Sequence, residues 1–119
     1  YARCFTIEET FRDVEDNRFG MGMSSTRIGV PARRDRILLL AAIAQALLTL
    51  LGAAGEECGL DRNFKAYTIA KRAMSLFNQG CYWNDAIPMM PQERLAVLKD
   101  AFGEIIRQHA DSRDLLCAI

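Results

Sequence analysis

One long apolar run constrains this chain more than any other feature of its sequence. Between residues 37 and 54, only Gln45, Thr49 and Gly52 interrupt apolar side chains. The pattern predicts a helix over 32–57 that is apolar on every side. Such a helix must be covered on every side, as the central helix of a larger soluble protein is. Any structure that the chain adopts must therefore shield the apolar surface of this helix from water.

A membrane is the alternative cover for this helix. Eighteen residues of this composition can span a bilayer, and basic residues before the run with Glu56 and Glu57 after it suit insertion. However, six of the eighteen are alanines, which gain little on transfer, and Gln45 would lie at mid-membrane. We therefore expect a cytoplasmic protein with no membrane span. The cover would come from elements beyond this chain or from a homo-oligomer formed through helix 37–54.

The rest of the pattern is helical as well. Residues 2–16 place Cys4, Ile7, Phe11 and Val14 on one helical stripe. A helix over 69–79 is expected after Thr68 as N-cap, with Gly80 beyond its end and a loop over 81–90. A last helix begins at Pro91 and carries its apolar stripe on Leu95, Leu98, Phe102 and Ile105, while Gly59 is expected to end the long helix. No stretch alternates long enough for a strand, so the sequence predicts one all-α domain over 1–119, a helical bundle of about four helices.

Composition excludes several classes of protein. Of the 119 residues half are apolar and a quarter are charged, which excludes intrinsic disorder, collagen and a low-complexity tail. The four cysteines, at positions 4, 58, 81 and 117, form no CxxC pair, and His109 is the one histidine, so no zinc pattern can be assembled. We expect four thiols in a reducing compartment.

The formal net charge of zero hides an uneven distribution. Residues 17–80 carry nine basic residues against four acidic ones, whereas both flanking segments are net acidic. Clusters of this density can neutralise phosphates, although a solvated helix start and an ordinary exposed face give the same pattern. The candidate DNA-contacting residues are Arg27, Arg33, Arg34 and Arg36 in one cluster, with Lys65, Lys71 and Arg72 in another, which also contains Arg62.

One face of the first predicted helix carries a candidate metal ligand. Tyr1, Cys4, Glu8 and Glu15 fall within about 60° of one another at 100° per residue. Glu8 lies at the edge of the apolar stripe and could bind a hard divalent cation if other carboxylates approached it. A surface pair with Arg12, four residues on, is the alternative.

The run from Tyr1 to Glu15 and the segment 20–23 resemble the signature of a family of bacterial insertion-sequence transposases. These are DDE enzymes, and their motif reads Tyr, two residues, Arg, three residues, Glu, six residues, Lys. Later segments resemble, in the same order, those that follow the signature in such proteins: 33–40, 47–55, 59–62, 65–72 and 75–80. The resemblance covers at least residues 1–80.

The resemblance implies specific roles. Glu8 matches the third catalytic acid of the family, which joins two Asp residues in holding two Mg²⁺ or Mn²⁺ ions on a ribonuclease-H-like fold. Tyr1 matches the motif tyrosine, which contacts the backbone of the transposon end. The helices of this chain would then correspond to the C-terminal helical part of such a transposase.

The departures from the motif argue against activity in this chain alone. Cys4 stands at the motif Arg and Glu15 at the motif Lys, so two phosphate-gripping cations are missing. The two catalytic Asp residues have no counterpart here. We therefore expect a catalytically inactive transposase fragment with no cofactor of its own and weak DNA contact. The alternatives are a self-associating helical module and, less favoured, a small single-span membrane protein.

Overall fold

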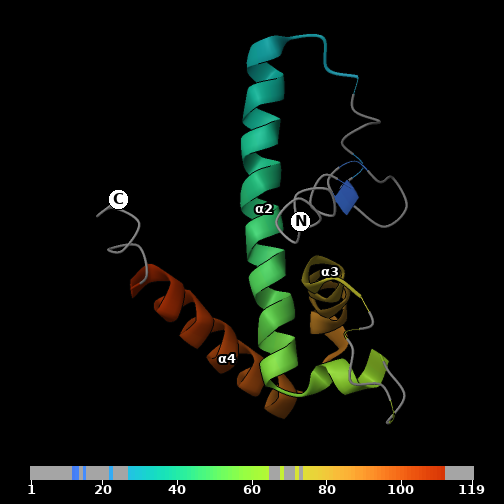
Figure 1. Ribbon diagram of the computed structural model, residues 1–119, viewed down its shortest axis with the longest axis vertical. Helices are drawn as coiled ribbons and strands as arrows, with labels where there is room; N and C mark the ends of the chain where they lie inside the picture. The colour runs from blue at the N-terminus through green and yellow to red at the C-terminus, as the bar shows by residue number, and fades with distance from the viewer. Residues whose placement is uncertain are drawn as a thin grey trace. The chain divides into compact units, whose positions relative to one another are not determined.

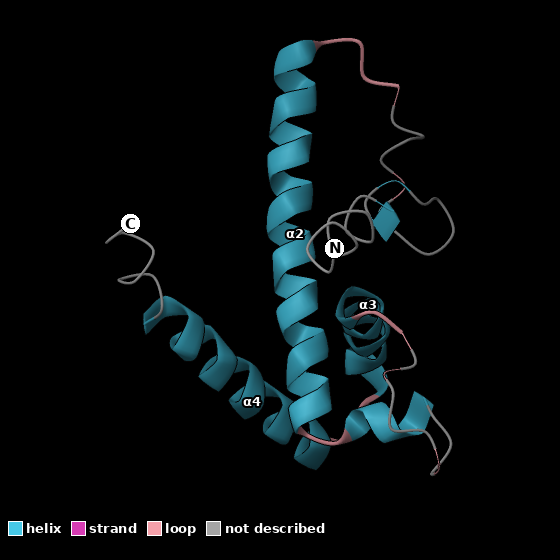
Figure 2. Ribbon diagram, in the orientation of Figure 1, coloured by secondary structure: helices cyan, strands magenta, loops and turns pink. Residues whose placement is uncertain are grey.

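Every element of regular secondary structure that the structure describes in this chain is a helix. The structure is a computed structural model, and it describes residues 12–13, 15, 22, 27–64, 68, 72 and 74–111. Within these residues there is no strand, which confirms the all-α prediction (Figures 1 and 2). The elements with described bounds are α2 (Pro31–Glu57), η2 (Leu60–Phe64), α3 (Leu76–Ala86), η3 (Ile87–Met89) and α4 (Gln92–Asp111). The predicted helix over 2–16 lies largely outside these residues.

Two compact units divide the chain between Leu47 and Leu48, within α2. The described part of the first unit consists mainly of the first half of α2. The second unit holds the remaining turns of α2 together with η2, α3, η3 and α4.

Helix α2 begins and ends close to where the sequence places it. The carbonyl of Val30 accepts hydrogen bonds from the backbone N–H groups of Arg33 and Arg34, both at 3.1 Å, which closes the first turn. At the other end, Gly59 has a φ of 72° and its N–H donates to the Glu56 carbonyl at 2.9 Å. A residue without a Cβ adopts this left-handed conformation without strain, so the prediction of a stop at Gly59 is confirmed.

Helix α3 corrects the sequence prediction at both ends. It begins after Ser75, whose hydroxyl accepts a 3.2 Å hydrogen bond from the Asn78 N–H, and not after Thr68. It then continues through Gly80 to Ala86, where a loop was expected. The first backbone N–H groups of a helix have no carbonyl partner within the helix. The helix therefore begins where a side chain can accept a hydrogen bond from one of them, and Ser75 does so here.

Gly80 continues the helix because it serves packing. A Cβ at residue 80 would overlap the carbonyl oxygen of Leu48, and a Cβ at Gly52 would overlap that of Leu76. The two glycines therefore let α2 and α3 touch backbone against backbone. An isolated glycine in a helical pattern is either a stop or a close contact, and the sequence does not distinguish the two.

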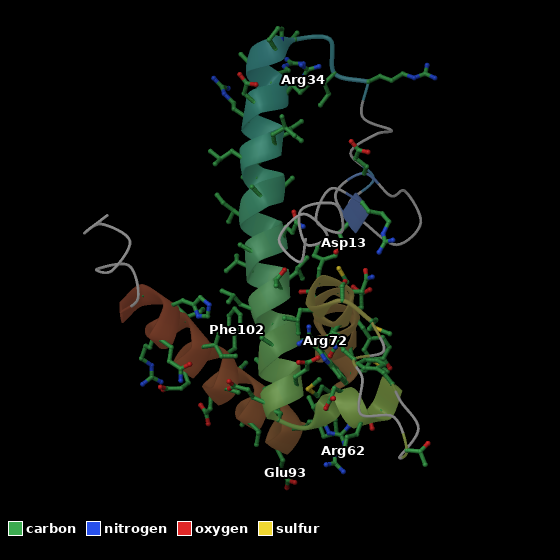
Figure 3. All side chains as sticks on the ribbon, in the orientation of Figure 1. Asp13, Arg34, Arg62, Arg72, Glu93 and Phe102 are labelled. Atoms are coloured by element: carbon green, nitrogen blue, oxygen red, sulfur yellow. The ribbon has the colours of Figure 1, made fainter. Side chains whose placement is uncertain are left out.

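The core of the second unit forms where three helices meet. Ala54 of α2, Trp83 of α3, and Leu98 and Ile105 of α4 form one buried cluster. Leu95 is also buried and Phe102 packs partly against the cluster, so the predicted apolar stripe of α4 is confirmed (Figure 3).

An aromatic group joins η2 to α3. The ring of Phe64 lies 4.7 Å from that of Tyr82 and 5.0 Å from that of Trp83, measured between centroids. The Tyr82 and Trp83 rings meet edge to face at 5.1 Å. Edge-to-face pairs of this kind add stabilisation beyond the area that they bury. These ring contacts hold η2 against α3.

Candidate functional site

The start of α2 carries a concentrated positive charge. Arg27 precedes the helix, and Arg33, Arg34 and Arg36 lie in its first two turns. All four residues are exposed, and none forms an ion pair or a side-chain hydrogen bond with another described residue. Figure 3 labels Arg34 at this end of α2. These residues are called the arginine group below.

The position of the arginine group makes its charge electrostatically unfavourable. The N-terminal end of a helix carries partial positive charge from its unpaired N–H groups, and cations there are destabilising. No acidic residue lies in the first turn of α2, and Asp35 is the one acid between residues 27 and 55. A bound anion would relieve both the mutual repulsion of the arginines and their repulsion by the helix dipole.

The second predicted basic cluster is only partly described. Arg62 is exposed on η2, whereas Lys65 and Lys71 lie outside the described residues. Arg72 forms an ion pair with Glu56, its Nε lying 2.6 Å from Oε1 and its Nη2 2.9 Å from Oε2. Because its guanidinium is engaged by a carboxylate, Arg72 is less available to a phosphate than the arginine group is.

Glu56 is the centre of a polar contact between α2 and the segment around α3. Its side chain keeps a quarter of its accessible surface. Besides Arg72, it accepts a 2.9 Å hydrogen bond from Nε2 of Gln79. The Arg72 guanidinium lowers the pKa of Glu56 below its ordinary value of 4.5, and the hydrogen bond from Gln79 acts in the same direction while partial burial opposes it.

Two buried polar atoms on α3 have no partner among the described residues. Gln79 is 2% exposed and its Oε1 accepts no hydrogen bond, while Nε1 of Trp83 donates none. Both residues face α2, since Gln79 reaches Glu56 and Trp83 lies against Gly55. Sequence analysis did not predict this buried polar pair, because a glutamine in a helical pattern is usually a surface residue.

The residues that carry the signature resemblance are mostly outside the described part. Tyr1, Cys4 and Glu8 lie outside the described residues. The metal-ligand prediction for Glu8 and its alternative pairing with Arg12 are therefore not tested. Glu15 is described as helical and exposed. In the described residues, no three His, Cys, Asp or Glu side chains come together as a metal site would require.

Two of the four cysteines are described, Cys58 and Cys81, and both are thiols. The Sγ of Cys58 lies 3.7 Å from the carbonyl oxygen of Val97. Partial burial raises the pKa of the Cys58 thiol, and the charge of Glu57 adds to the effect. A raised pKa lowers the thiolate fraction, which makes a nucleophilic role for Cys58 unfavourable.

The first half of α2 exposes large aliphatic side chains. Leu39 keeps 62% of its surface, Leu40 64%, Ile43 50% and Leu47 47%. By length and composition α2 could cross a membrane, with a mean hydropathy of 2.3 over its most apolar window. Its second half differs, because Gly52, Ala54 and Gly55 are buried within the chain.

Comparison with known proteins gives no relative for this chain. No protein-family model, no curated protein and no solved structure matches it.

Proposed function

We propose that the chain derives from the C-terminal helical part of an insertion-sequence DDE transposase and retains weak, sequence-independent contact with DNA. The proposal joins two independent supports. One is the ordered series of segments that resemble this family, from the signature at Tyr1 to residue 80. The other is the arginine group at the start of α2.

The arginine group is the observation that carries the DNA proposal. Four exposed guanidinium groups have no carboxylate partner in the described residues, whereas Arg72 and Arg107 are both paired. Each unpaired arginine can displace a condensed counterion from DNA by binding a phosphate oxygen. Contacts of this kind position a protein on DNA but read no bases. The predicted binding is therefore weak, non-specific and sensitive to salt.

Catalysis by this chain alone is not part of the proposal. In the family, the acid that Glu8 matches works with two Asp residues that have no match here. Glu15, exposed where the family places a lysine, would repel a nearby phosphate. We therefore derive no metal-dependent step for this chain and propose a fragment without its own cofactor.

A soluble, cytoplasmic location is part of the same proposal. The last turns of α2 pack against α3, whose exposed or half-exposed face carries Asn78, Asn84 and Asp85. Of the apolar run, only residues 37–47 then remain free to contact lipid in a membrane. These eleven residues rise about 16 Å as a helix, roughly half the thickness of the hydrocarbon core. This packing favours a soluble protein over the single-span alternative.

A salt titration tests the DNA proposal directly. Fluorescence anisotropy of labelled duplexes of unrelated sequence would report the dissociation constant at several salt concentrations. We expect equal affinity for each duplex and a steep loss of affinity as salt rises, since phosphate contacts release counterions. Affinity that is unaffected by salt, or that differs strongly between sequences, would refute it.

A further inference from the structure

Three of the exposed aliphatic residues of α2 form an ordered ridge. Leu39, Ile43 and Leu47 are four residues apart, so they follow one row along the helix surface. Each keeps about half of its surface or more, and the small side chains of Ala42 and Ala46 beside the ridge are exposed too. Contiguous aliphatic surface of this kind drives association in water.

We propose that this ridge is the contact surface for a second copy of the chain, bound antiparallel with Ile43 on the two-fold axis. The proposal is independent of DNA binding. It also narrows the association surface expected from the sequence, 37–54, to the ridge formed by Leu39, Ile43 and Leu47. Residues 48–54 are unavailable because Gly52 and Ala54 are buried against the other helices of their own unit.

The spacing and composition of the ridge allow a second copy to bind it symmetrically. Turning the ridge end for end about Ile43 exchanges Leu39 with Leu47, so the surface is complementary to itself. Two copies then form the pairs Leu39 with Leu47 of the partner subunit, Ile43 with its equivalent, and Leu47 with Leu39. Such an isologous contact closes after two copies and leaves no open end for further growth.

Charge selects the antiparallel direction. Arg33, Arg34 and Arg36 all lie at one end of the ridge, so a parallel pair would place six guanidinium groups together. Like charges at that spacing repel, and no acidic residue on the first turn offsets them. The antiparallel pair places the two groups at opposite ends. It also leaves both arginine groups exposed.

The ridge geometry also limits the length of the contact. When rows of residues four apart interdigitate, helices cross at about −50°, so they diverge on both sides of the crossing point. A crossing at Ile43 confines the contact to roughly three turns. The small side chains of Ala42 and Ala46 allow the two helices to approach closely.

Mass measurement by light scattering or sedimentation tests the dimer. At high micromolar concentration we expect twice the 13.4 kDa mass of the chain, unchanged in high salt because the contact is apolar. Ile43→Glu should return the mass to one chain. Leu38→Glu is the matched control, since Leu38 is 46% exposed on the same helix but lies about 140° away around it. A monomeric wild-type chain, or dissociation by Leu38→Glu alone, would overturn the proposal, as would recovery of the chain on phosphatidylcholine vesicles instead of in solution.

Disulfide trapping tests the direction, with one copy enlarged by a tag so that mixed products separate by mass. Leu39→Cys mixed with Leu47→Cys should give a cross-linked mixed dimer beyond the level that the native cysteines give in the wild-type chain. Leu39→Cys alone should not, because the antiparallel pair keeps the two copies of residue 39 apart. Efficient cross-linking by Leu39→Cys alone, without the mixed product, would show a parallel pair and contradict the inference.

Discussion

Gly80 of α3 lies directly against the backbone of Leu48 in α2. A Cβ at residue 80 would overlap the Leu48 carbonyl oxygen and approach its carbonyl carbon to 2.6 Å. Gly52 stands in the same relation to Leu76, so each helix contributes a glycine to the contact. The two backbones cannot move apart without separating the buried side chains of Ala54 and Trp83 in the core.

Gly80→Ala should therefore destabilise the fold. Alanine is favoured over glycine in a helix by about 1 kcal/mol, but the overlap with backbone atoms outweighs that gain. We expect a net loss of about 2 kcal/mol in the free energy of unfolding, measured by urea denaturation. Gly103→Ala is the control, because among the described residues its Cβ would meet Arg107 alone, at 4.0 Å, and this change should stabilise by up to about 1 kcal/mol. Equal effects of the two changes would contradict the packing described here.

Glu56→Gln should lower stability at neutral pH but not at low pH. Because Arg72 holds the folded-state pKa of Glu56 below 4.5, the ion pair contributes stability above that pH. The contribution disappears as the pH falls through the folded-state value. We expect a difference from wild type of about 1 kcal/mol at pH 7, narrowing under acid conditions, in urea denaturation at several pH values.

Glu104→Gln provides the comparison for this change. Glu104 pairs with Arg107 at 3.3 Å on the surface of α4, and both side chains are at least half exposed. Removing such a pair should change stability by less than about 0.5 kcal/mol at any pH. If Glu104→Gln matched Glu56→Gln across the pH range, the contact between Glu56 and Arg72 would have no special role.

Ser75→Ala should weaken the start of α3. The Ser75 hydroxyl satisfies the N–H of Asn78, and alanine at an N-cap costs about 1 kcal/mol. Thr68→Ala should have almost no effect, because residue 68 lies in an exposed turn outside the helix. Urea denaturation of both variants decides between the two helix starts. A larger loss for Thr68→Ala would restore the start expected from the sequence.

Replacing Arg33, Arg34 and Arg36 together by glutamine should weaken DNA binding. Each lost phosphate contact reduces the slope of log affinity against log salt by about 0.9, so three contacts reduce it by roughly 3. The matched control replaces Arg62, Arg94 and Lys99, which are exposed at other sites, and changes the net charge equally. Fluorescence anisotropy should show a much smaller effect for the control. Equal losses would mean that net charge and not the arginine group governs binding.

The sequence by itself determined the elements whose signals are local. The apolar run fixed α2 to within a residue of its observed bounds, Gly59 fixed its end, and the stripe of Leu95, Leu98 and Ile105 fixed the inner face of α4. These features depend on periodicity and on the conformational freedom of one glycine, which a single sequence displays. The position of the arginine group at a helix start was readable in the same way.

Tertiary structure alone decided the rest. Gly80 reads as a helix stop in sequence, yet it continues α3 because the Leu48 backbone leaves no room for a side chain. Likewise, the sequence does not distinguish Arg72 from the arginine group as a candidate phosphate contact. The structure does, because it pairs Arg72 with Glu56, sixteen residues away along the chain. Both outcomes depend on contacts between segments that are distant along the chain. A local sequence pattern does not show which backbone or carboxylate packs beside a given residue in the folded structure.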